Sequence, residues 1–92
     1  MPRIALVDDE RSILTSVSLA LQQEGFEVDT FMNGEEAMSG FEKKKYDLGL
    51  FDIKMPRMNG NELLMKVRSS KKPELKNMPI IFLTSRDQEQ DE

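Results

Sequence analysis

Short apolar runs alternate along this chain with stretches in which apolar residues recur at helical spacing. Residues 3–7 (RIALV) form a run typical of a β-strand, and residues 26–31 alternate apolar and polar positions. That alternation predicts a strand with one exposed face, at the edge of a sheet. Residues 46–51 and 78–83 are the other two strand candidates. The last run, MPIIFL, is nearly all apolar, which predicts a strand covered on both faces.

Three amphipathic stretches between these runs predict helices. The first, residues 12–25, ends at Gly25, which is a natural helix stop. Asn33-Gly34 forms a turn or cap before the second stretch, and residues 61–70 form the third. The residues predicted to face inward are Ile13, Leu14, Val17, Ala20 and Leu21 in the first stretch, Ala37, Met38 and Phe41 in the second, and Leu63, Leu64 and Val67 in the third.

The remaining segments are polar. Pro73 and Pro79 bound a segment predicted to be a connection, and residues 86–92 are typical of the first turn of another helix. The element order is therefore β-α-β-α-β-α-β with a further helix beginning. This order predicts an α/β fold with right-handed crossovers and a parallel sheet.

Composition limits the functions open to this chain. Its 92 residues predict one small domain, and 17 acidic against 13 basic residues give a formal charge of -4. The basic residues form no face-long stripe in the sequence, which argues against nucleic-acid binding by this chain alone. The absence of cysteine and histidine from the sequence excludes disulfides and thiolate or histidine metal sites, so the plentiful metal ligands are carboxylates. The apolar runs are too short for a signal peptide or a membrane span, so a cytoplasmic protein without membrane contact is expected.

Four polar residues follow predicted strands at the ends where ligands bind in open parallel sheets. Asp8 and Asp9 follow the first strand, Asp52 the third and Thr84 the fourth. If the first and third strands are neighbours, as in the 2-1-3-4-5 order, the three carboxylates converge and need a cation. Mg²⁺ suits them because it prefers oxygen ligands. A hydroxyl such as Thr84 could hold phosphoryl oxygens beside the metal, and a carboxylate there is a plausible nucleophile that gives an aspartyl phosphate.

Each residue also has an ordinary structural interpretation. Asp8 and Asp9 with Glu10 could simply cap a helix, Asp52 could begin a turn, and Thr84 could be a helix N-cap. The expected convergence of all four at one edge of the sheet is what favours a functional site.

The sequence resembles the receiver domain of two-component response regulators, in particular those of the OmpR/PhoB-like class. The matching segments are LVDDE, FDIKMPRMNG and FLTS, in this order along the whole chain. The resemblance implies a flavodoxin-like (CheY-like) doubly wound sheet and a receiver domain over residues 1–92. It also implies that Asp52 is the phosphoacceptor, that Asp9 ligates Mg²⁺ directly and that Asp8 acts largely through a bound water.

The same resemblance assigns the remaining roles. The backbone carbonyl of Lys54 would complete the metal site, and Thr84 would be the switch hydroxyl. The phosphoryl donor would be a phosphohistidine on a sensor histidine kinase. Receivers help to catalyse their own phosphorylation and dephosphorylation, but their product is a conformational signal, so no other enzyme activity is expected. Lys54 and Arg86 lie where family members screen the phosphoryl group, which predicts slow hydrolysis; solvated loop charges are an equally good interpretation.

The sequence stops at Glu92, before the family's fifth strand, the lysine that follows it and the fifth helix. We therefore expect an incomplete fold with strands one to four, in which the run 78–83 becomes a sheet edge. Such a chain is expected to form a homodimer or a domain-swapped dimer, to fold only in part, or to be a fragment of a longer protein. DNA contact would require an output domain that is absent here.

Three functions compete on these grounds. The leading hypothesis is a phosphoacceptor switch that controls a transcriptional output. The second is a phosphorylation-independent dimerisation or interaction module on the receiver scaffold. The third is a metal-dependent phosphohydrolase with an aspartate nucleophile, which is disfavoured because such enzymes commonly carry a second acid two residues on, where this chain has Lys54.

Overall fold

The computed structural model describes residues 1–55 and 58–83. Its elements, in chain order, are β1 (Arg3–Val7), α1 (Arg11–Gln23), β2 (Glu27–Phe31), α2 (Gly34–Lys43), β3 (Leu48–Asp52), α3 (Gly60–Arg68), α4 (Pro73–Lys76) and β4 (Ile80–Leu83).

The four described strands form one parallel sheet in the order β2-β1-β3-β4. The register pairs Val7 of β1 with Phe31 of β2 on one side and with Phe51 of β3 on the other. The predicted α/β fold, the parallel sheet and the neighbouring first and third strands are therefore confirmed. The predicted edge position of β2 is confirmed as well, and its residues are exposed or only partly buried.

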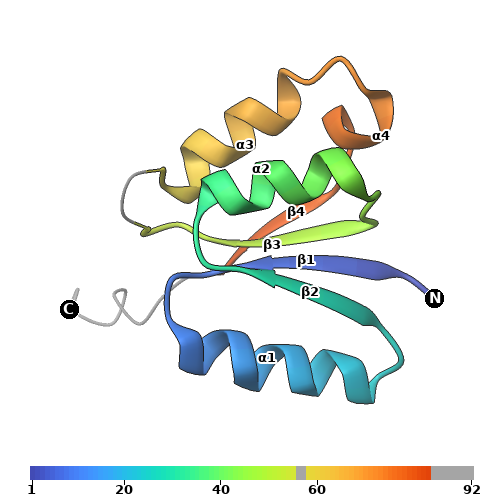
Figure 1. Cartoon of the computed structure of the whole chain (residues 1–92), viewed down its shortest axis with the longest axis vertical. Helices are drawn as coiled ribbons and strands as arrows, with labels where there is room; N and C mark the ends of the chain where they lie inside the picture. The colour runs from blue at the N-terminus through green and yellow to red at the C-terminus, as the bar shows by residue number, and fades with distance from the viewer. Residues whose placement is uncertain (56–57, 84–92) are drawn as a thin grey trace.

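Helices cover both faces of the sheet, with α1 on one face and α2, α3 and α4 on the other (Figure 1). Because successive strand residues point to opposite faces, Ile4 and Leu6 of β1 pack on the α1 side while Ala5 and Val7 pack on the α2 side. The inward positions predicted for α2 are confirmed, since Ala37 and Phe41 are buried and Met38 packs against the same cluster. Within the described residues, no helix has the length and apolar character that crossing a bilayer requires.

Local polar contacts set the helix ends. Asn33 caps α2 by accepting a hydrogen bond from the Glu36 N–H at 2.8 Å. Gly25, which follows α1, has φ of +98°, a left-handed conformation that glycine adopts without strain. At α3 the cap is Asn59, which forms a reciprocal capping box with Glu62, so this helix begins one residue earlier than predicted.

Three sequence predictions need correction. The segment after Pro73, predicted as a connection, contains the short helix α4, because proline is favoured in a first helical turn. Ala20, predicted to face inward, is exposed on α1. Ile81 of β4 is 54% exposed, so the prediction that this strand is covered on both faces is wrong. Its physical reason is that α1 packs against β1 and β2, while Ile81 lies in β4 at the other end of the described sheet.

Candidate functional site

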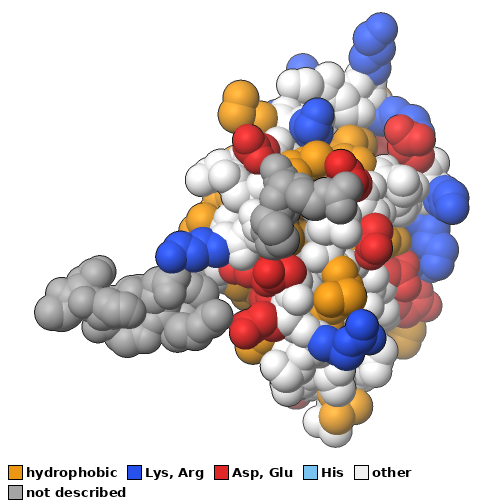
Figure 2. Space-filling model, turned by 60° about the vertical axis from the view of Figure 1, so that its left-hand side comes forward, with side chains coloured by type: hydrophobic (Ala, Val, Ile, Leu, Met, Phe, Trp, Pro, Cys, Tyr) orange, Lys and Arg blue, Asp and Glu red, His pale blue; other side chains and the backbone are white. Residues whose placement is uncertain are grey.

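The acidic residues singled out in the sequence meet at the carboxyl edge of β1 and β3. Asp52 is the last residue of β3, and Asp8 and Asp9 directly follow β1. Because these strands are neighbours in parallel register, the structure brings the three carboxylates together. One carboxylate oxygen from each residue lies within 4.8 Å of the others. Figure 2 shows acidic side chains gathered on the face that this edge presents.

The carboxylates of Asp8 and Asp52 are held by hydrogen bonds from main-chain N–H groups. Asp8 is 4% exposed and Asp52 is 6% exposed, whereas Asp9 is the most accessible of the three. The Asp8 carboxylate accepts a hydrogen bond from the Glu10 N–H at 2.9 Å, and the Asp52 carboxylate accepts one from the Lys54 N–H at 3.3 Å. These bonds orient both acids toward the crevice between the strands.

Burial and neighbouring charges both disfavour the ionised form of Asp8 in this cluster. Burial is the main cause that raises the pKa of Asp8, and the nearby charges of Asp9 and Glu10 raise it further. The hydrogen bonds that Asp8 makes with the Glu10 N–H and with Asp52 lower its pKa but do not cancel the rise. The cluster therefore favours whatever positive charge is available, either a proton or a metal ion.

The donor set fits a hard divalent cation. Three carboxylate oxygens that lie close together and repel one another are ligands of the kind that Mg²⁺ accepts. Lys54 follows the site with an exposed side chain, and its main-chain N–H already binds Asp52. Thr84 and Arg86, the other two residues singled out in the sequence, lie outside the described residues.

Sequence reasoning missed several residues that shape the site. The Asp8 N–H donates to the carbonyl of Phe31 at 3.0 Å, which ties the acidic segment to the end of β2. The Gly60 N–H donates to the Ile53 carbonyl at 2.9 Å, and a Cβ on Gly60 would lie 2.5 Å from the main-chain oxygen of Asp52. Only glycine therefore lets α3 begin this close to the end of β3. The capping-box pattern of Asn59 and Glu62 was the sequence signal that could have located this helix start.

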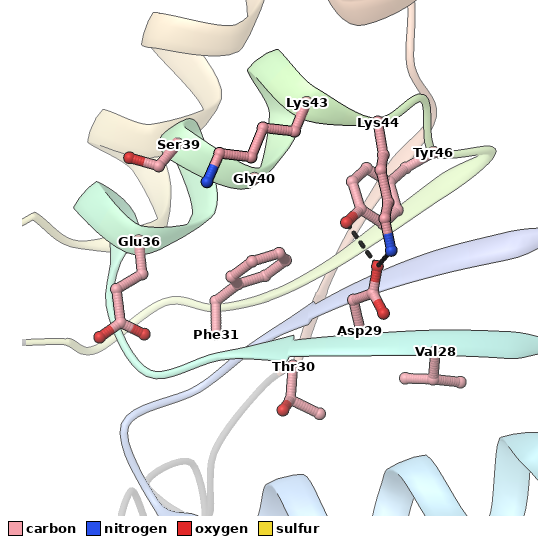
Figure 3. A pocket seen from close by; sticks show the side chains of 10 residues that line it. All are labelled: Val28, Asp29, Thr30, Phe31, Glu36, Ser39, Gly40, Lys43, Lys44 and Tyr46. Atoms are coloured by element: carbon pink, nitrogen blue, oxygen red, sulfur yellow. Dashed lines mark hydrogen bonds and ion pairs between the residues drawn. The ribbon is translucent and has the colours of Figure 1, made fainter.

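A separate pocket of about 660 Å³ lies between β2 and α2 (Figure 3). At its rim the Tyr46 hydroxyl donates to the Asp29 carboxylate at 2.6 Å, and the Lys44 ammonium lies 3.5 Å from the same oxygen. Burial, followed by this contact with Asp29, raises the pKa of Tyr46 well above its usual value. Since Asp29 is already engaged and no residue of the acidic cluster lines the pocket, it is not part of the site.

The fold and the acidic crevice define a doubly wound α/β domain whose site lies where the strand order reverses, between β1 and β3. The chain belongs to the response regulator receiver domain family, whose model matches residues 4–92. The fold class and the resemblance stated from the sequence are thus confirmed. Receiver domains are signalling domains that bind Mg²⁺ at an acidic pocket and interact with sensor histidine kinases.

Known relatives place the chain more closely. It is 38% identical over 89 residues to the phosphate regulon transcriptional regulatory protein PhoB of Rhizobium meliloti and 37% identical over 89 residues to the alkaline phosphatase synthesis transcriptional regulatory protein PhoP of Bacillus subtilis. Each match covers 97% of this chain, but 38% of PhoB and 35% of PhoP. Among solved structures it is similar to response regulator TrrA from Thermotoga maritima in complex with Mg²⁺-BeF, with 41% identity and a TM-score of 0.84 over 99% of this chain and 76% of that one.

Proposed function

We propose that this chain is a phosphoacceptor switch in which Asp52 takes a phosphoryl group from a phosphohistidine of a sensor histidine kinase. The observation that carries the proposal is the convergence of Asp52 with Asp8 and Asp9, whose carboxylate oxygens lie within 4.8 Å of one another at the edge of a receiver fold. The similar TrrA structure, described as a Mg²⁺-BeF complex, supports a metal-assisted phosphoryl site in this family.

The family resemblance suggests the roles of the individual residues. Asp9 would hold Mg²⁺ directly, Asp8 would act largely through a bound water, and Asp52 and the main-chain carbonyl of Lys54 would complete the site. When bound, Mg²⁺ neutralises the charge that the carboxylates and the phosphoryl oxygens bring together. An Asp52 oxygen forms the new bond to phosphorus while the bond to the donor imidazole nitrogen breaks, and the electron pair of that bond stays on the imidazole. The hydroxyl of Thr84 then turns toward the phosphoryl group as the switch.

The signal is proposed to control transcription in the cytoplasm through an output domain that contacts DNA. This proposal rests on the two relatives, which are named as transcriptional regulatory proteins and of which this chain spans 38% and 35% of the length. Lys54 and Arg86 are proposed to slow hydrolysis by screening the aspartyl phosphate from water. Unchanged dephosphorylation rates in both Lys54→Ala and Arg86→Ala would rule out that role.

Intact-mass spectrometry tests the central step. The chain is mixed with Mg²⁺ and acetyl phosphate, and a single phosphoryl adduct is expected. The adduct should be lost in Asp52→Asn and retained in Asp47→Asn, a control at an exposed acid that precedes β3. An adduct that survives in Asp52→Asn, or a folded wild-type chain that forms none with Mg²⁺ present, contradicts the proposal.

One observation favours the alternative of a phosphorylation-independent dimerisation module. Ile81, 54% exposed on β4 at the end of the described sheet, is an apolar residue that a second copy would cover in a homodimer or a domain-swapped dimer formed through this strand. Sedimentation of the wild type and Ile81→Lys at several concentrations tests this reading. A dimer that is lost on substitution and indifferent to acetyl phosphate supports the module, whereas a monomer excludes it.

A further inference from the structure

The turn between β2 and α2 supplies none of the three acids, yet it contacts both sides of the acidic crevice. On one side the Phe31 carbonyl, at the end of β2, accepts the hydrogen bond from the Asp8 N–H at 3.0 Å. On the other side Gly34, the first residue of α2, lies against Met58 in the segment that joins β3 to α3. The turn thus contacts both Asp8 and Met58, which lies shortly before α3.

The contact between Gly34 and Met58 leaves no space for a side chain at position 34. Gly34 is buried, and a Cβ placed on it would lie 2.5 Å from the Met58 sulfur, 3.0 Å from its Cγ and 3.1 Å from its Cβ. The sulfur could swing away at little cost, but the Met58 Cβ is tied to the main chain. A side chain at position 34 therefore requires Met58 or the start of α2 to shift by a few tenths of an ångström.

A displacement at Met58 reaches Asp52 through contacts that cannot yield easily. Met58 precedes Asn59, which caps α3, and Gly60, whose N–H binds the Ile53 carbonyl at 2.9 Å. At Gly60 the helix start and the Asp52 carbonyl are already so close that an added Cβ would lie 2.5 Å from that oxygen. The start of α3 is thus held by α2 at Met58 and by the end of β3 at Gly60.

We infer that the Gly34–Met58 contact is a positioning contact, which holds the main chain after Asp52 at the separation from Asp8 that Mg²⁺ binding and phosphorylation require. The inference rests on the proposed function. Its physical basis is that a metal and phosphoryl site must be held within about 0.5 Å of its productive geometry, so a shift of a few tenths of an ångström uses up much of that tolerance. Gly34 and Met58 act through the segment they hold, and neither touches the reacting atoms.

The test begins with Gly34→Ala. Alanine favours helix more than glycine does, so a role in α2 alone predicts unchanged or higher stability of the fold. The positioning contact instead predicts that the Mg²⁺ dissociation constant, read from amide shifts in NMR spectra, rises by about 3- to 10-fold, since small misplacements in such sites are costly. The rate of phosphorylation by acetyl phosphate should fall by a similar factor.

A second substitution makes the test specific. Met58→Gly removes the Cβ, Cγ and sulfur that an added methyl on Gly34 would meet, so the Gly34→Ala/Met58→Gly double variant should bind Mg²⁺ more tightly than the product of the single effects predicts. Met58→Leu, which keeps the bulk, should resemble the wild type. Strictly additive effects, or a Gly34→Ala chain with an unchanged dissociation constant, would overturn the inference.

Val67→Ala is the control for general destabilisation. Val67 is fully buried in the last turns of α3, so its truncation lowers the stability of the fold without touching Met58's contact with α2. Its Mg²⁺ dissociation constant should match that of the wild type. If the wild type binds Mg²⁺ but forms no phosphoryl adduct, the proposed function fails while the Mg²⁺ titrations still decide the positioning contact. A wild type that does not bind Mg²⁺ overturns both.

Discussion

Replacing Asp8 by asparagine should stabilise the protein when no divalent cation is present. One Asp8 oxygen lies within 4.8 Å of oxygens of Asp9 and Asp52, and at this distance two unit charges repel by about 3.5 kcal/mol for an effective dielectric constant near 20, or about 0.9 kcal/mol in bulk water. Burial is the main cause of the raised pKa of Asp8 and the charge of Asp9 adds to it, so the ionised Asp8 carboxylate is costly in the folded chain. We therefore expect the free energy of unfolding to rise by about 1–2 kcal/mol, which corresponds to roughly 5–15 °C in Tm.

The pH dependence of stability is a second test of the prediction that Asp8→Asn stabilises the fold. Burial and the neighbouring acids raise the folded-state pKa of Asp8 above its ordinary value of 3.8. Between these two values the native state holds more protons than the unfolded state, so this group makes stability fall as pH rises through that window. Above the window the loss is complete. Asp8→Asn should lack this component and show a flatter profile on its acidic side.

Urea unfolding followed by circular dichroism, in EDTA and again with Mg²⁺, measures both effects. Mg²⁺ at 100 times its dissociation constant should stabilise the wild type by about 2.7 kcal/mol and the Asp8→Asn chain far less. Asp47→Asn, at an exposed acid that is not in the cluster, should respond to Mg²⁺ as the wild type does. An Asp8→Asn chain that is less stable in EDTA, or that Mg²⁺ stabilises fully, would refute the account of mutually repelling carboxylates.

Three further substitutions test the structure around the site. Gly60→Ala places a methyl against the Asp52 main-chain oxygen and should lower the free energy of unfolding by about 1–3 kcal/mol and weaken Mg²⁺ binding; an unchanged Tm would contradict this close approach. Tyr46→Phe should lower the free energy of unfolding by about 1 kcal/mol because the hydrogen bond to Asp29 is lost. Tyr46 is the chain's single tyrosine, so the absorbance of the folded wild type should show tyrosine ionisation only at a pH well above 10. Arg68→Lys removes a guanidinium nitrogen that donates hydrogen bonds to the carbonyls of Lys76 and Met78 at 2.7 and 2.8 Å. The substitution should lower the free energy of unfolding by about 1–2 kcal/mol, and an unchanged urea midpoint would show that these two hydrogen bonds are dispensable.

The spacing of apolar residues along the sequence predicted most of the fold. Alternating apolar runs and helical stretches predicted the four strands and their parallel pairing, because each short run leaves few ways to bury one face against a helix. The same reasoning predicted that Asp8, Asp9 and Asp52 would meet, since it needs only strand ends and the order of the strands. The roles assigned to these residues, and to Lys54, remain proposals.

The contacts that the sequence did not predict depend on distances between segments far apart in the chain. Nothing at position 34 indicates that Met58 will occupy the space where a side chain would be, and nothing in MPIIFL indicates that α1, which packs against β1 and β2, leaves Ile81 uncovered. Such features are set by how the helices pack on the sheet, which local sequence preferences do not determine. Glycines at close approaches are the residues most easily misread as ordinary turn residues.

The parallel sheet also has a consequence for how the chain folds. Arg3 pairs with Glu27, Ile4 with Leu48 and Gly49 with Ile80, so each pairing among the described strands requires the chain to cross at least one intervening helix, and none of these pairings can start from a hairpin. On a ribosome β1 leaves first, yet it stays without its second partner until residue 52 has emerged. We therefore expect the sheet to form cooperatively and only after β3 has been synthesised. The closure of long loops, and not helix formation, should limit the folding rate.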